Sequence, residues 1–104
     1  MEMTEMIRKL ALGYREDIIR VRRTIHNNPE LGHEEFETAA FLTKELSALG
    51  HNVQGGLGGT GVSTLLRGEK EGKTLLIRAD MDALPITEDG IAARRNTCSN
   101  RGWI

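Results

Sequence analysis

The order of apolar and polar positions predicts two helices followed by three strands. Apolar residues recur every three or four positions from about residue 5 to residue 26, the spacing of an amphipathic helix. This face consists of Met6, Leu10, Tyr14, Ile18, Val21 and Ile25. The following Asn27, Asn28 and Pro29 end the helix, because the residue before proline disfavours helical geometry. A second amphipathic pattern predicts a helix over residues 36–49 that stops at Gly50.

The pattern changes from helical to extended after Gly50. Short apolar or β-branched runs at residues 51–54, 61–67 and 74–79 are strand candidates, and the polar turn at 68–73 predicts a hairpin between the last two. The fold class is therefore α/β. Residues 90–104 contain no Asp or Glu and show no period, so an unstructured tail is expected there after a domain at 1–89.

Composition fits one small folded domain. The chain has 104 residues, of which 38% are apolar and 28% are charged, and its net charge of −1 suggests neither a nucleic-acid nor a membrane partner. We see neither an apolar run of membrane-spanning length nor a secretory signal, and Cys98, the single cysteine, cannot form an internal disulfide. A cytoplasmic location is the expectation.

Asp80 and Asp82 are the candidate site residues. They follow the apolar run 74–77, at the strand end where α/β proteins bind ligands. Two carboxylates there can hold a cation or divide acid and base roles between them. The structural alternative is an Asp-rich turn closed by Pro85, because Asp favours turns.

Other motifs favour structural roles. Residues 56–61 match the dinucleotide-binding pattern of glycines, but a strand-like run follows where that motif needs a helix. A glycine-rich loop between strands is the better interpretation. His26 and His33 lack tight metal-ligand spacing, and Glu30 is expected to be a solvated or capping carboxylate.

Three segments together resemble one enzyme family. They are Arg22-Arg23-Thr24-Ile25-His26-Asn27-Asn28-Pro29-Glu30-Leu31-Gly32-His33-Glu34-Glu35, then Gly58-Gly59-Thr60-Gly61-Val62, then Arg78-Ala79-Asp80-Met81-Asp82-Ala83-Leu84-Pro85. Over roughly residues 5–89 the chain resembles the N-terminal part of metal-dependent amidohydrolases, the metallopeptidase group that includes aminoacylases, hippurate hydrolase and auxin-conjugate hydrolases.

The resemblance implies a function and ranks the two aspartates. It implies hydrolysis of N-acyl amino acids by an α/β catalytic domain with two zinc or manganese ions, in enzymes that can form homo-oligomers. Asp82 matches an aspartate that orients a metal-binding histidine, a common role of carboxylates beside metals. In related branches of the family that histidine stands at the position of Asp80. Asp82 is therefore the first candidate and Asp80 the second.

The chain also departs from the family pattern. The expected His-Ala-Cys-Gly-His-Asp stretch is not found, and Cys98 has no histidine after it. A catalytic zinc needs about three protein ligands. We therefore expect residues 1–89 to be an incomplete catalytic domain, residues 90–104 an aberrant tail, and the isolated chain inactive, marginally stable and without bound metal. Two alternatives stay open: pairing with a longer homologue, or a binding module that holds a divalent cation through Asp80 and Asp82.

Overall fold

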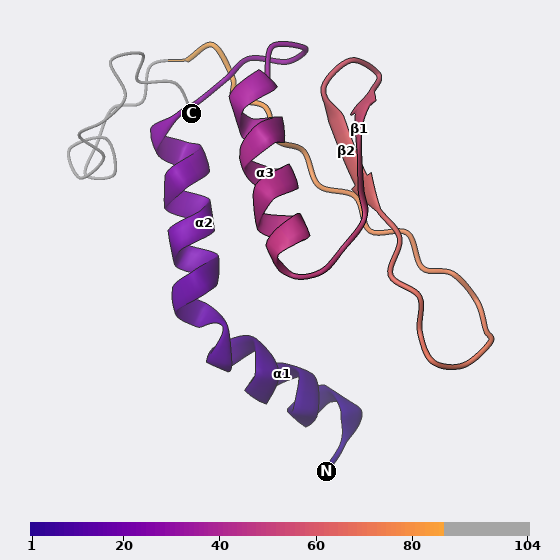
Figure 1. Cartoon of the computed structure of the whole chain (residues 1–104). Coiled ribbons are helices and arrows are strands. Elements are labelled where there is room, and N and C mark those ends of the chain that lie inside the picture. The colour runs from indigo at the N-terminus through magenta and orange to yellow at the C-terminus, as the bar shows by residue number, and fades with distance from the viewer. Residues whose placement is uncertain (87–104) are drawn as a thin grey trace.

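A computed structural model describes residues 1–86 as three helices and one two-stranded sheet (Figure 1). The elements in chain order are α1 (Met3–Gly13), α2 (Arg15–Asn27), α3 (Phe36–Ala48), β1 (Val53–Leu57) and β2 (Gly61–Thr64). The predicted α/β class is confirmed, and the helix predicted at 36–49 ends within one residue of its expected position. The predicted tail at 90–104 lies outside the described residues.

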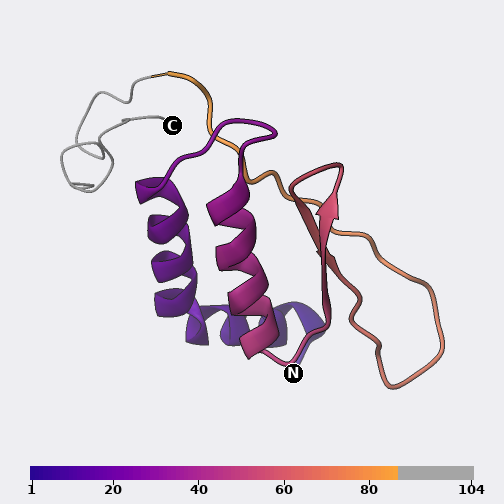
Figure 2. The same cartoon turned by 45° about the horizontal axis from the view of Figure 1, so that its top comes forward.

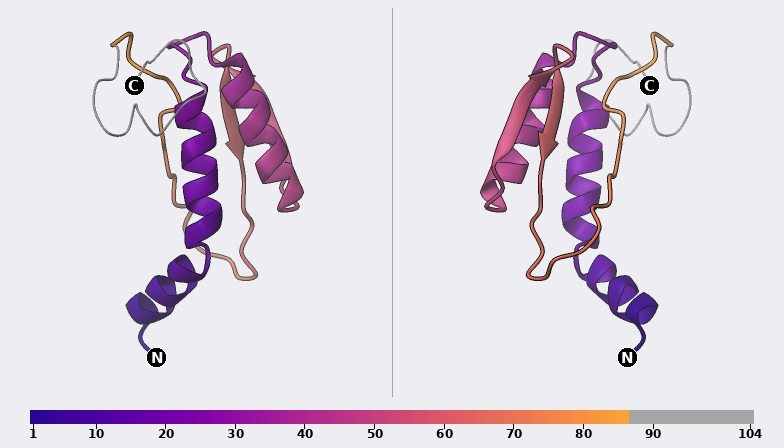
Figure 3. Two further views of the ribbon diagram at one scale, coloured as in Figure 1. Left: turned by 90° about the vertical axis from the view of Figure 1, so that its left-hand side faces the viewer. Right: turned by 90° about the vertical axis from the view of Figure 1, so that its right-hand side faces the viewer.

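The prediction of one long helix from residue 5 to residue 26 is wrong in one respect, because the chain bends at Tyr14 and forms two helices. Tyr14 separates α1 from α2 with φ −95° and ψ 6°, and it follows Gly13. Glycine is a poor helix former, so a bend costs little there. Both views in Figure 3 show α1 turning away from the line of α2. The predicted end of the helix is confirmed: α2 stops at Asn27, and the Asn28 side chain donates to the carbonyl of Thr24 at 2.9 Å.

The helix α3 lies between α2 and the hairpin (Figures 1 and 2). A bidentate ion pair joins α2 to α3, in which Arg20 Nη1 and Nη2 lie 2.8 and 2.9 Å from the carboxylate oxygens of Glu45. The Arg20 hydrogen bond and charge lower the pKa of Glu45 against a smaller opposing effect of burial. This bidentate pairing is a direct side-chain contact between the two helices.

The glycine-rich segment connects two strands, as predicted, and these two strands pair as an antiparallel hairpin. Val53 pairs with Thr64 and Leu57 pairs with Gly61, with an irregularity between Gln54 and Leu57. Gly58 and Gly59 have φ values of 60° and 107°, which residues with a Cβ rarely adopt. The turn therefore needs glycine for its shape, which accounts for the glycine spacing without a nucleotide.

The third predicted strand, at 74–79, is not formed in the described part of the chain, and neither is the predicted hairpin with 61–67. Leu75, Leu76 and Ile77 are instead 83%, 89% and 83% exposed. A strand exists only when a neighbour takes up its backbone hydrogen bonds, and residues 1–86 place none beside this run. The apolar pattern is correct for a strand, but a pattern cannot supply the partner.

The end of this segment returns to the loop between α2 and α3. Leu31 and Ala83 form a parallel bridge, and the Ala83 N–H donates to the carbonyl of Glu30 at 2.7 Å. Ala83 is 8% exposed. Ala83 is thus anchored to the loop before α3, although the two are far apart in sequence.

The interior of the described part is small and unusually polar. Its buried polar residues are Glu35, Thr38 and Thr60, and no large side chain among residues 1–86 is fully buried. Many apolar side chains that the helical pattern assigned to a core are exposed, Leu10 and Ile18 among them. The described part therefore has apolar faces that no other described residue covers. Among residues 1–86, we find no helix with both the length and the apolar character needed to cross a membrane.

Glu30 caps the beginning of α3, as its predicted role suggested. Its carboxylate accepts hydrogen bonds from the N–H groups of Glu37 and Thr38, at 3.1 and 2.5 Å, and from Thr38 Oγ1 at 2.6 Å. These N–H groups at a helix start have no partner inside the helix. Burial opposes ionisation of Glu30, but the three hydrogen bonds outweigh it and lower its pKa.

Replacing Glu30 by Ala is expected to lower the free energy of unfolding by about 1–2 kcal/mol, because α3 then starts without its carboxylate cap. The effect should be largest above pH 4.5 and should shrink as the pH falls through the lowered pKa, since a protonated Glu30 caps less well. Urea unfolding followed by circular dichroism at neutral and acidic pH measures both. Glu34→Ala, in the same loop but exposed, is the control and should change little; equal losses in both variants would contradict the capping role.

Candidate functional site

Three segments that are distant in sequence line one pocket of about 300 Å³. The α2–α3 loop contributes Gly32, His33 and Glu35, the hairpin contributes its turn, and the extended segment contributes residues 79–82. The hairpin residues in the lining are Leu57, Gly58, Thr60 and Gly61. The pocket therefore gathers residues from all three segments that carried the family resemblance.

The carboxylates of Asp82 and Glu35 both lie close to Gly32. A Cβ atom built on Gly32 would be 3.3 Å from Asp82 Oδ2 and 3.8 Å from Glu35 Oε1. The first distance is tighter than an ordinary van der Waals contact, so a side chain at position 32 would push on the Asp82 carboxylate. The glycine lets the Asp82 carboxylate approach the backbone of the loop closely.

The Glu35 carboxylate ties two of the three segments together. It is buried, with 6% exposure, and it accepts hydrogen bonds from Thr60 Oγ1 and, at 2.7 Å, from the N–H of His33. His33 has φ 67°, a conformation uncommon outside glycine, and it points its N–H back at Glu35. The Thr60 hydrogen bond, foremost, lowers the pKa of Glu35 against the opposing effect of burial. Glu35 is thus an ionised carboxylate with two fixed donors.

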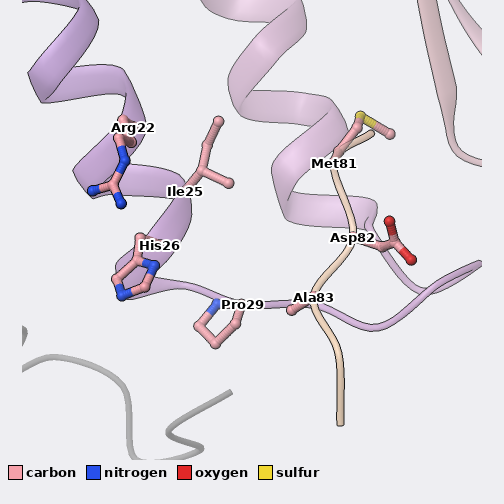
Figure 4. A pocket seen from close by; sticks show the side chains of 7 residues that line it. All are labelled: Arg22, Ile25, His26, Pro29, Met81, Asp82 and Ala83. Atoms are coloured by element: carbon pink, nitrogen blue, oxygen red, sulfur yellow. The ribbon is translucent and has the colours of Figure 1, made fainter. Parts of the chain in front are cut away.

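A second pocket, of about 190 Å³, lies on the other side of the extended segment (Figure 4). Arg22, Ile25 and His26 line it from α2, and the Ala83 side chain points toward Pro29 across it. The carboxylate of Asp82 points away from Arg22 and His26 in this view. Neighbouring side chains of an extended chain point to opposite sides, so Ala83 packs against the α2 end while Asp82 faces the loop of Gly32.

The two aspartates predicted from the sequence line the 300 Å³ pocket but have different surroundings. Asp80 forms an exposed ion pair with Arg78, with Nη2 and Oδ1 3.3 Å apart and the Asp80 side chain 73% exposed. Asp82 has its carboxylate beside Gly32 and close to buried Glu35. The Asp82 carboxylate therefore lies against the backbone of the loop, whereas the Asp80 carboxylate is paired with Arg78 and exposed.

The described residues do not by themselves fit a catalytic metal. Among residues 1–86, we find no group of three His, Cys, Asp or Glu side chains arranged to hold an ion. Asp80 is paired with Arg78, and both oxygens of Glu35 already accept hydrogen bonds. About three protein ligands are needed for a catalytic zinc, so residues 1–86 could supply only part of such a site.

The sequence interpretation missed Glu35 and Thr60. Both residues lie in segments that resemble the family, but their residue types alone assigned no role to either of them. A signal was present for Glu35, because it occupies the N-cap of α3, where Ser, Thr, Asp or Asn is preferred and where its own side chain makes no capping bond. A glutamate at that position needs another partner.

Curated proteins with similar sequences are carboxypeptidases and amidohydrolases. The chain is 42% identical over 89 residues to thermostable carboxypeptidase 2 of Saccharolobus solfataricus. The aligned stretch covers 85% of this chain and 23% of that protein. The N-acyl-L-amino acid amidohydrolase of Geobacillus stearothermophilus is 40% identical over 82% of this chain and 23% of its own length. The N-acetyl-L-cysteine deacetylase of Bacillus subtilis is 45% identical over 70% of this chain and 18% of its own length.

The chain thus spans about a fifth to a quarter of the length of these relatives. No family model matches the sequence. No solved structure matches it either.

Proposed function

This chain is homologous to carboxypeptidases and N-acyl-amino-acid amidohydrolases, and we propose that it supplies one part of a site that hydrolyses the amide bond of N-acyl amino acids. The observation that carries the proposal is the meeting of the α2–α3 loop, the hairpin turn and residues 79–82 at one pocket. These are the segments that resemble the family, and their meeting at one pocket supports a shared role.

The chain's own residues have distinct parts in this proposal. Asp82 presents a carboxylate to the pocket, where it orients a neighbouring group of the complete site, as carboxylates beside reacting centres do. Glu35 and Thr60 hold the loop and the hairpin turn in place around it. Zinc or manganese is the cofactor expected from the resemblance, and most of its ligands would come from outside residues 1–86.

Isolated, the chain is proposed to be inactive, because the described residues leave the site incomplete. Incubation with N-acetyl amino acids and added zinc or manganese should release no free amino acid above the buffer rate. Steady metal-dependent release that is removed by a chelator would contradict this part of the proposal.

A transplant tests the site itself. The segment of the Geobacillus amidohydrolase that aligns with this chain, 85 residues at 40% identity, is replaced by the matching residues of this chain. We expect the transplanted enzyme to hydrolyse the parent's N-acyl amino acid substrates. A transplant that folds, by circular dichroism and by elution like the parent, yet hydrolyses none of them would overturn the proposed function.

A further inference from the structure

One face of α1 is apolar and has no partner in the described part of the chain. Met3, Met6, Ile7 and Leu10 follow the spacing of one helix face and are 71%, 44%, 59% and 57% exposed. No residue of α1 is buried. The bend at Tyr14 turns α1 away from the rest of the molecule, so that this face is open to another molecule (Figures 1 and 3).

The four apolar residues are placed symmetrically about the midpoint between Met6 and Ile7. With about 100° of rotation per residue, they fall within about 50° on either side of one line along the helix. Met3 and Leu10 lie at equal distances from the midpoint, and so do Met6 and Ile7. An antiparallel pair of α1 helices would therefore place Met3 opposite Leu10 of a second copy and Met6 opposite Ile7 of that copy.

Charges beside this face favour the same arrangement. Glu2, the N-cap of α1, and Lys9 lie on one flank of the apolar line, about 90–110° from it, on opposite sides of the midpoint between Met6 and Ile7. The opposite flank holds the uncharged Thr4 and Ala11. A two-fold axis through the midpoint brings Glu2 of each copy alongside Lys9 of the other, whereas a parallel pair would set this charged flank against the uncharged one.

We propose that α1 is a homodimerisation surface on which a second copy of this chain docks antiparallel through Met3, Met6, Ile7 and Leu10. The pattern is self-complementary in both apolar contacts and charge, which is what a two-fold interface between identical chains requires. The contact is one short helix per chain, so the dimer forms in a concentration-dependent manner. It does not depend on the hydrolytic function proposed above.

Sedimentation equilibrium of the chain tests this proposal, with a reductant present to prevent cross-linking through Cys98. Over about a hundredfold range of concentration, the average mass should rise from the 11.5 kDa of one chain toward twice that value. Leu10→Lys should raise the dissociation constant of the dimer at least about tenfold. Leu12→Lys is the matched control, because Leu12 is 63% exposed but lies on the opposite side of α1, and it should leave the dimer intact.

The charged flank gives a second test. Glu2→Lys and Lys9→Glu should each weaken the dimer, and the double variant should restore it because the pair is then reversed. A mass of 11.5 kDa at every concentration would overturn the proposal. So would equal effects of Leu10→Lys and Leu12→Lys, or charge reversals that add instead of compensating.

Discussion

Replacing Asp82 by Asn in the transplanted enzyme is expected to lower kcat about 10- to 100-fold, the usual cost of losing a carboxylate that orients a group at a reacting centre. Asn keeps the size of the side chain but removes its charge. The variant should keep its fold, because the Asp82 side chain is exposed to the pocket and its neighbour Ala83 makes the anchoring hydrogen bond.

Asp80→Asn in the same enzyme is the matched control. Asp80 pairs with Arg78 on the surface, and exposed ion pairs of this kind contribute little. We expect its kcat to change far less than that of Asp82→Asn. Initial rates over a range of substrate concentrations give kcat and KM for both. Equal losses, or a larger loss for Asp80→Asn, would mean that the ranking of the two aspartates is wrong.

Replacing Thr60 by Val is expected to raise the pKa of Glu35 and to destabilise the pocket. The change removes the hydroxyl that donates to the buried Glu35 carboxylate, which then keeps only the N–H of His33. Loss of one buried hydrogen bond lowers the melting temperature of a domain of this size by roughly 5 °C. Thr60→Ser keeps the hydroxyl and is the control.

The stability lost in Thr60→Val should depend on pH in a definite direction. The pKa of Glu35 is lowered in the folded chain, so its ionised form adds stability above the ordinary value of 4.5, and this contribution is lost as the pH falls through the lowered pKa. In Thr60→Val the lost stability should be greatest near neutral pH and smaller in acid. The carboxyl carbon shift of Glu35, followed by NMR against pH, measures the pKa directly. An unchanged pKa in Thr60→Val would contradict the assigned hydrogen bond.

The sequence predicted the features that depend on local chemistry. Asn28 and Pro29 end a helix through their own backbone preferences, Gly58 and Gly59 make a turn through positive φ values, and Glu30 caps the next helix. Each of these is set by neighbours a few residues away. Asp82 was predicted to follow a strand at 74–79; that strand is not formed in the described part of the chain, yet Asp82 lines the pocket.

The features that were missed depend on contacts between distant residues. The Glu35–Thr60 hydrogen bond joins positions 25 residues apart, and neither residue type reveals its partner. The run 74–79 has strand chemistry but no neighbouring strand in the described part of the chain. The bend at Tyr14 reflects the low helix propensity of Gly13, which the regular spacing of apolar residues did not reveal.

The central claim is that this chain itself brings the α2–α3 loop and residues 79–83 together, and the amide hydrogen exchange of Ala83 tests it most directly. The Ala83 N–H is buried and donates to Glu30, so it should exchange at least about tenfold more slowly than an unstructured amide. Leu76, in the exposed run, should exchange at close to the unstructured rate. If Ala83 exchanges as fast as Leu76, residues 79–83 do not dock on the loop and the site described here does not form.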